Sequence, residues 1–219
     1  MDIDSMKNQI ICGDCLEAMK DIPDKSIDLV LTDLPYGIKM DKGFGCFDGF
    51  NGKGAPIKRR RYEKDDWDNT RPSKEVFNEI LRIGKKVFIF GGNFFADILP
   101  QLSHWIVWDK LNTMPTFGDC ELIWTNIDRK SVKKITYEYN GLIGREEKRF
   151  HPTQKPVELL KEIINRYSES ENDTVLDCFL GSGTTAVACK QLNRNFIGIE
   201  ISEKYCEIAR QRLRQGILI

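Results

Sequence analysis

The chain has 219 residues, 41% of them hydrophobic, which is enough to bury the core of one domain. Its 33 lysines and arginines balance 33 aspartates and glutamates, so overall charge does not indicate a polyanionic partner. No apolar run approaches the roughly 20 residues that cross a bilayer, and the acidic N-terminal stretch is not a secretory signal. Seven cysteines, an odd number, indicate reduced thiols. We therefore expect a cytoplasmic protein with no membrane partner.

No metal site is expected. A four-thiolate zinc site needs two C-x-x-C pairs, and the sequence has one, at Cys12 and Cys15. The two histidines, His104 and His151, have neither helical nor paired spacing. The candidate chemistry is therefore expected to come from carboxylates, backbone groups and an organic cofactor.

Short runs rich in valine, isoleucine and leucine alternate with helical segments. In chain order we expect strand 10–12, helix 15–20, strand 27–32, helix 74–83, strand 86–90, strands 106–108 and 122–124, helix 156–168, strand 174–176, helix 184–192, strand 196–199 and helix 203–215. Apolar strands joined by helices predict an α/β fold, a doubly wound and mostly parallel sheet forming one domain over residues 1–219. Strands 106–108 and 122–124 are expected to form an antiparallel hairpin leading into the C-terminal half. Ligands of such sheets bind at the carboxyl ends of the strands.

Two segments interrupt the alternation, 38–72 and 126–150. Both interleave basic residues with aromatic ones, a composition that suits phosphates and unstacked bases. We expect residues 38–72 to form a mobile loop; a solvated segment without a ligand is the alternative for both. The residues predicted to contact nucleic acid are Lys58, Arg59, Arg60, Arg61, Lys133 and Lys134.

The segment 177–186 follows an expected strand and opens an expected helix. Its two glycines permit a tight turn and close approach of the backbone to a ligand. The pattern also fits a dinucleotide, but Asp177 would repel a pyrophosphate, whereas it would hold the ammonium group of S-adenosylmethionine. Glu200, which ends the next strand, is placed to accept hydrogen bonds from two ribose hydroxyls. We therefore predict an S-adenosylmethionine site rather than an NAD site, formed by Asp177, Phe179, Gly181, Gly183, Thr184, Thr185 and Glu200.

Asp14 follows the first expected strand. That strand is expected to lie beside the strand that ends at Glu200, so Asp14 is a candidate acceptor for the adenine amino group of the cofactor. The alternative is that Asp14 caps the helix that begins at Cys15.

Four motifs resemble those of amino-group DNA methyltransferases. Residues 32–37 (TDLPYG) resemble the Asp-Pro-Pro-Tyr catalytic motif of the family, and residues 177–185 (DCFLGSGTT) resemble its cofactor-binding motif. Residues 151–156 (HPTQKP) and the opening 12–17 (CGDCLE) are also typical. The catalytic motif precedes the cofactor motif, an order that resembles the circularly permuted β class, with a Rossmann-like methyltransferase fold. The resemblance spans nearly the whole chain.

The resemblance implies roles for the residues of the catalytic motif. The Asp33 carboxylate and the Leu34 carbonyl would accept the two N–H groups of an exocyclic base amine, freeing the nitrogen lone pair. Pro35 is the next residue of the motif, and Tyr36 would stack on a base flipped out of the duplex. The family usually has proline where this chain has Leu34. The carbonyl is unaffected by that difference, so we expect the rate rather than the reaction to depend on it.

The resemblance also implies that Thr153 and Lys155 hold the methionyl end of the cofactor; the alternative is that they only start the following helix. Asn93, after two glycines, is a weaker candidate for lining the pocket. Target recognition is assigned to residues 126–150. That segment is short, so we expect a short double-stranded DNA site or help from a second subunit, and a homodimer is carried over from the β class. With no endonuclease motif visible, we expect a solitary or phage-type methylase.

The expected activity is S-adenosylmethionine-dependent methylation of DNA, most consistent with N6 of adenine because aspartate rather than serine opens the motif. N4 of cytosine and N6 of adenine in RNA are the alternatives. A non-catalytic nucleic-acid binder and an NAD-dependent dehydrogenase are further alternatives, which cofactor-binding measurements distinguish.

Overall fold

The computed structural model describes residues 2–38, 70–111, 118–139, 150 and 154–215. These residues belong to two compact units, Met1–Leu34 with Ser73–Ile219, and Pro35–Pro72. The first unit contains every helix and strand found in the described ranges.

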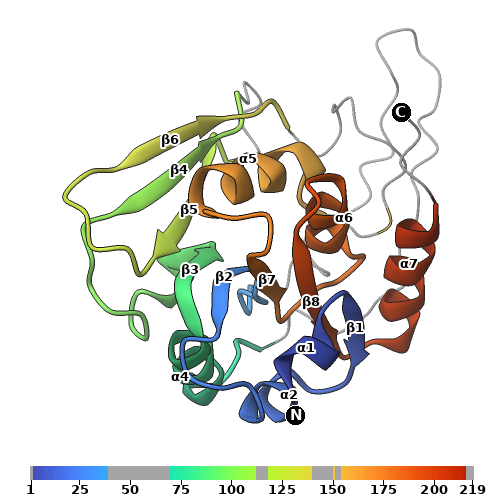
Figure 1. The fold of residues 1–219 in the computed structure, drawn as a ribbon. Coiled ribbons are helices and arrows are strands. Elements are labelled where there is room, and N and C mark those ends of the chain that lie inside the picture. The colour runs from blue at the N-terminus through green and yellow to red at the C-terminus, as the bar shows by residue number, and fades with distance from the viewer. Residues whose placement is uncertain (1, 39–69, 112–117, 140–149, 151–153, 216–219) are drawn as a thin grey trace, which may run out of the picture. The chain divides into compact units, whose positions relative to one another are not determined.

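One eight-stranded sheet forms the centre of the first unit, in the order β1-β8-β7-β2-β3-β5-β4-β6 (Figure 1). Its strands are β1 (Gln9–Cys12), β2 (Ile27–Thr32), β3 (Gly84–Phe90), β4 (Trp105–Asp109), β5 (Cys120–Thr125), β6 (Lys133–Thr136), β7 (Thr174–Asp177) and β8 (Asn195–Glu200). All pairings are parallel except those of β5, which runs antiparallel to both β3 and β4. The predicted mostly parallel α/β sheet with an antiparallel β4–β5 pair is therefore confirmed.

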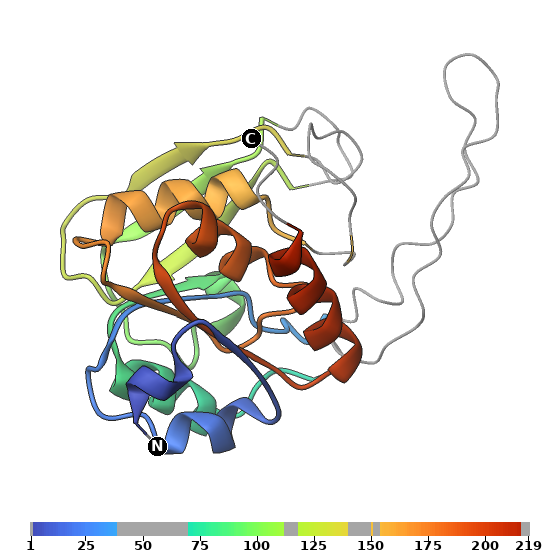
Figure 2. The same ribbon diagram turned by 45° about the vertical axis from the view of Figure 1, so that its right-hand side comes forward.

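Helices cover both faces of this sheet, α2 and α4 on one side and α5, α6 and α7 on the other (Figures 1 and 2). The helices are α1 (Ile3–Met6), α2 (Cys15–Lys20), α4 (Lys74–Ile83), α5 (Val157–Tyr167), α6 (Thr184–Gln191) and α7 (Glu203–Arg214), with a 3₁₀ turn, η1, at Gly92–Phe95. In α4 the buried residues are Val76, Phe77, Ile80 and Ile83, the spacing of one helix face. No helix of the described ranges has the length and hydropathy of a membrane span.

Strand β6 lies at one edge of the sheet, paired with β4 alone, and the sequence does not predict it. Of its four residues, Lys133, Lys134, Ile135 and Thr136, only Ile135 is buried. Edge strands often have charged residues that prevent further pairing, and such strands lack the apolar run by which a buried strand is recognised.

The antiparallel direction of β5 determines which of its residues lie at the carboxyl ends of the parallel strands. The carboxyl ends of the parallel strands β1, β8, β7, β2 and β3 share one edge of the sheet, and antiparallel β5 brings its N-terminal residues to that same edge. Residues at the start of β5 therefore lie near residues that follow β2 and β3.

Candidate active site

Asp177 ends β7 and is almost fully buried. Its carboxylate accepts hydrogen bonds from Thr32 Oγ1 at 2.9 Å, the Phe179 amide at 3.1 Å and Thr185 Oγ1 at 2.5 Å. Burial raises the pKa of Asp177 to about 6, although these hydrogen bonds act to lower it. A buried carboxylate of this kind is stabilised in its ionised form when a cation is placed beside it, which fits an ammonium ligand.

The glycine turn between β7 and α6 contains two left-handed residues with different surroundings. Gly181 has φ +54°, and a Cβ built on it would meet no heavy atom of the described residues within 4 Å. Gly183 has φ +86°, and a Cβ there would lie 2.6 Å from Ala209 Cβ on α7. Gly181 therefore leaves open space above the turn, as a close-lying ligand requires, whereas Gly183 allows α6 and α7 to pack together.

This difference predicts that two alanine substitutions affect different properties, one mainly stability and the other mainly cofactor binding. Gly183→Ala should lower the free energy of unfolding by roughly 3 kcal/mol, since it combines backbone strain with overpacking against Ala209. Gly181→Ala should cost about 1 kcal/mol from strain alone, yet weaken S-adenosylmethionine binding about tenfold because its methyl group enters the open space. Urea unfolding and titration calorimetry measure both effects. Equal loss of stability in the two variants would contradict this assignment.

Glu200 ends β8 beside the same turn, and both oxygens of its carboxylate are hydrogen-bonded to backbone amides. Oε2 accepts from the Gly181 amide and Oε1 from the Ser202 amide, each at 2.8 Å. Burial raises the pKa of Glu200, while these amides act to lower it. These contacts fix the carboxylate over the glycine turn, where the remaining lone pairs suit hydroxyl donors.

Asp14 lies two residues beyond β1, which pairs with β8 so that Cys12 is opposite Glu200. Its Oδ1 accepts hydrogen bonds from the Leu16 and Glu17 amides at 2.8 and 3.1 Å, which makes Asp14 the N-cap of α2. The capping role is thus observed, and the contact with a cofactor adenine stays a prediction.

Asp33 follows β2 at the same edge of the sheet and is paired with Lys155. The Lys155 Nζ lies 2.6 Å from Asp33 Oδ2 and 3.1 Å from Glu121 Oε1. Burial lowers the pKa of the Lys155 ammonium, but the two carboxylates more than offset this, so its pKa is raised. Lys155 therefore stays charged. Its contacts are with Asp33 and Glu121, and its role at the methionyl end of a cofactor stays a prediction.

A polar cluster links α6, α7 and the segment before α5. Ser182 Oγ donates to Gln154 Oε1 at 3.1 Å, and Arg212 Nη1 donates to the Ser182 carbonyl at 2.8 Å and to Thr184 Oγ1 at 3.2 Å. Sequence reasoning missed Gln154, Arg212 and Glu121. Gln154 lies within the HPTQKP motif, where it could have been singled out, whereas Arg212 and Glu121 have no local signal.

The remaining predicted residues are as follows. Lys58, Arg59, Arg60, Arg61 and Thr153 are outside the described residues. Pro35 and Tyr36 belong to the second compact unit. Lys133 and Lys134 are exposed on β6, with Lys134 paired to Asp109 at 3.1 Å, and Asn93 lies in η1. Leu34, which follows Asp33, is buried.

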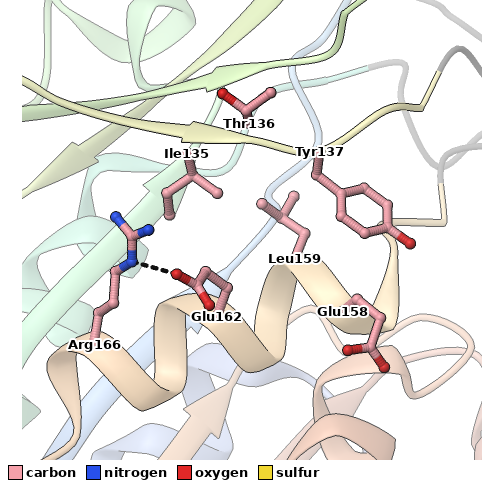
Figure 3. Close-up of a pocket in the computed structure, with 7 residues that line it drawn as sticks. All are labelled: Ile135, Thr136, Tyr137, Glu158, Leu159, Glu162 and Arg166. Atoms are coloured by element: carbon pink, nitrogen blue, oxygen red, sulfur yellow. Dashed lines mark hydrogen bonds and ion pairs between the residues drawn. The ribbon is translucent and has the colours of Figure 1, made fainter.

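A cavity of about 330 Å³ lies between β6 and α5 (Figure 3). It is lined by Ile135, Thr136, Tyr137, Glu158, Leu159, Glu162 and Arg166, and Arg166 is paired with Glu162 at 2.5 Å. None of the carboxylates at the strand ends lines it, so this cavity is separate from the candidate site. Within the described ranges, no group of three or more histidine, cysteine, aspartate or glutamate side chains could hold a metal ion.

Similar proteins were found by sequence and by structure. Residues 100–211 match the N6_N4_Mtase family model, described as DNA methylase. The type II methyltransferase M.HinfI of Haemophilus influenzae is 30% identical over 97% of this chain and 70% of that protein. M.HpaI of Haemophilus parainfluenzae is also 30% identical, over 95% of this chain and 74% of that protein.

Solved structures agree in fold. The M1.HpyAVI–SAM complex is 26% identical with a TM-score of 0.57, covering 94% of this chain and 98% of the other. The cytosine-N4-specific PvuII DNA methyltransferase has a TM-score of 0.63 at 16% identity, covering 96% and 87% of the two chains, a likeness of fold. From these matches, the chain belongs to the β class of the N6/N4 amino-methyltransferase family of DNA methylases.

Proposed function

We propose that this DNA amino-methyltransferase uses S-adenosylmethionine to methylate N6 of adenine in a short duplex sequence. The activity of the family, methylation of an exocyclic amine in DNA, follows from the relatives above. The choice of adenine is the finer proposal, and it is supported by aspartate at the first position of the catalytic motif.

One observation supports the proposal most directly. β2 and β7 are neighbouring parallel strands, and Thr32, the last residue of β2, donates its hydroxyl hydrogen bond to Asp177. Asp33 follows immediately. Asp33, which we propose as the acceptor for the base amine, and Asp177, which we propose as the partner of the cofactor ammonium group, therefore follow and end adjacent strands, and Thr32, the neighbour of Asp33, is hydrogen-bonded to Asp177.

The residues of the first unit fit S-adenosylmethionine. A buried carboxylate suits the ammonium group, the open space at Gly181 suits a close-lying ligand, and Glu200 suits ribose hydroxyls. When bound, S-adenosylmethionine supplies an electrophilic methyl group on sulfur. We assign the ammonium group to Asp177 and the ribose to Glu200.

The chain's own residues would activate the amine. The lone pair of an adenine amino group is delocalised into the ring, so the nitrogen is a poor nucleophile. Asp33 and the Leu34 carbonyl would accept its two N–H groups and draw the nitrogen toward tetrahedral geometry, while Tyr36 stacks on the flipped base. Burial of the Leu34 side chain holds its backbone in place without the family's usual proline. Alignment of nitrogen with the methyl group would supply much of the rate.

We further propose that residues 126–150 contribute to target recognition and that the basic run at 58–61 contacts phosphates. Within the first segment, the exposed Lys133 and Lys134 on β6 support this, because solvent-facing lysines suit a phosphate backbone.

The test is a methyl-transfer assay with labelled S-adenosylmethionine on unmethylated mixed-sequence duplex DNA, with Asp33→Ala as the negative control. The DNA is digested to nucleosides and the labelled one identified. We expect label in N6-methyladenine for the wild-type chain only. Label in N4-methylcytosine would correct the base, and transfer to RNA but not to duplex DNA would overturn the DNA proposal.

A further inference from the structure

Asp33, Lys155, Glu121 and Lys110 form a partly buried ionic cluster around the candidate catalytic carboxylate. Lys155 contacts both Asp33 and Glu121, and the second oxygen of Glu121 lies 3.0 Å from Lys110 Nζ. The side chains of Lys155 and Glu121 are 11% and 13% exposed. The solvent that weakens surface ion pairs is largely excluded, so each charge in this cluster affects its neighbours strongly.

The sheet explains how these residues meet. Asp33 follows β2 and Glu121 is near the start of β5, and β3 lies between these strands. Two strand spacings separate the backbones of β2 and β5 by roughly 9.5 Å. Lys155 spans this gap over the ring of Phe90, the last residue of β3, with its Nζ 5.1 Å from the ring centroid.

From this arrangement we infer that Glu121 is a positioning residue, which acts through Lys155 to set the orientation and charge of the Asp33 carboxylate. The inference rests on the proposed function, in which Asp33 accepts a hydrogen bond from the base amine.

The proposed activation of the amine needs a second carboxylate beside Lys155, in addition to Asp33. Lys155 holds Asp33 through Oδ2, at 2.6 Å. A lysine paired with Asp33 alone would neutralise it and weaken it as an acceptor. Because Glu121 shares the ammonium group, Asp33 keeps more of its negative charge while its orientation stays fixed. Lys110, held over the Trp108 ring at 4.7 Å, in turn anchors Glu121.

The matched variants are Glu121→Gln, which removes the charge, and Glu121→Asp, which keeps it on a shorter side chain. Removing a group that directly contacts the transition state costs about 10²–10³ in rate, so a group that acts through another is expected to cost about tenfold. Glu158→Gln on α5, whose partner is Lys161 at 2.9 Å, is the surface control.

The experiment measures single-turnover methyl transfer to mixed-sequence duplex DNA, the Kd for S-adenosylmethionine and the thermal midpoint of each variant. We expect Glu121→Gln to transfer methyl groups about tenfold more slowly, with cofactor Kd unchanged. Glu121→Asp should recover part of the rate, and Glu158→Gln all of it. A purely structural role would instead lower the midpoint and the rate together, without rescue by aspartate.

If the wild-type chain transfers methyl groups, two results for Glu121→Gln would overturn the inference. One is an undiminished rate, and the other is a cofactor Kd that rises by the same factor as the rate falls. Absence of transfer by the wild-type chain would overturn the proposed function itself, and this inference with it. If Glu121→Gln does not fold, Glu121→Asp decides: a slowed rate at unchanged Kd supports the inference, and a wild-type rate overturns it.

Discussion

Replacing Asp33 by asparagine should lower the single-turnover rate of methyl transfer by about 10³-fold, with the affinity for S-adenosylmethionine within about threefold of wild type. Asparagine keeps the size of the side chain but removes its charge. Its single carbonyl oxygen cannot both accept from the Lys155 ammonium, now 2.6 Å from Asp33 Oδ2, and accept from a base amine in the same orientation.

The loss is expected in the rate rather than in cofactor binding, because we assign the cofactor ammonium group to Asp177 and the base amine to Asp33. The control is Asp24→Asn, an exposed carboxylate paired with Arg82, where surface ion pairs contribute about 0–1 kcal/mol. Rapid-quench measurement of labelled DNA gives the rate, and calorimetry gives the Kd. An Asp33→Asn rate within tenfold of wild type would show that another group activates the amine.

The sheet is predictable from sequence where strands are buried on both faces. The segments that form β2 and β3, IDLVLT and VFIF, are continuous apolar runs, and each ends at a residue that opens a turn. The turn after β7 is also readable, since Asp177 and the glycines are adjacent in the chain. Local sequence therefore predicts where β7 ends and where the glycine turn begins.

The part of the site around Asp33 depends on contacts between distant parts of the chain. Glu121 lies 34 positions before Lys155 and reaches the site only because β5 runs antiparallel to β3. No local pattern gives strand direction, so no local pattern distinguishes Glu121 from an ordinary exposed glutamate. Gly183 shows the same limit: the motif suggests a role with the ligand, and the packing of Ala209 against it appears only in the folded structure.

Asp177→Asn should weaken S-adenosylmethionine binding by about 100-fold while making the ligand-free protein more stable at pH 8. Binding weakens because the ammonium group loses its charged, hydrogen-bonded partner, and truncating such a pair costs about 2–5 kcal/mol. Calorimetry at pH 8 measures the change in Kd. A Kd within threefold of wild type would show that Asp177 does not hold the ammonium group.

The gain in stability follows from the direction of the pKa shift. Burial raises the pKa of Asp177 from its ordinary value of 3.8 to about 6 in the folded protein. The folded state therefore binds this proton more tightly than the unfolded state. The resulting stability is fully present below pH 3.8 and is lost as the pH rises through about 6. At 1.36 kcal/mol per unit, the ionised group costs the ligand-free protein about 3 kcal/mol at pH 8, a cost that asparagine avoids.

The same shift predicts how cofactor affinity depends on pH in the wild-type chain. Only the ionised form of Asp177 attracts an ammonium group, and one pH unit below the pKa about one-tenth of the Asp177 carboxyl groups are ionised. The affinity for S-adenosylmethionine should therefore fall about tenfold between pH 8 and pH 5. Glu200 also has a raised pKa, so the comparison with Asp177→Asn at each pH isolates the contribution of Asp177. Urea unfolding of both proteins from pH 5 to pH 8 completes the test. If wild type and variant lose stability in parallel over this range, Asp177 is already ionised at pH 5, and the link between its burial and cofactor binding is wrong.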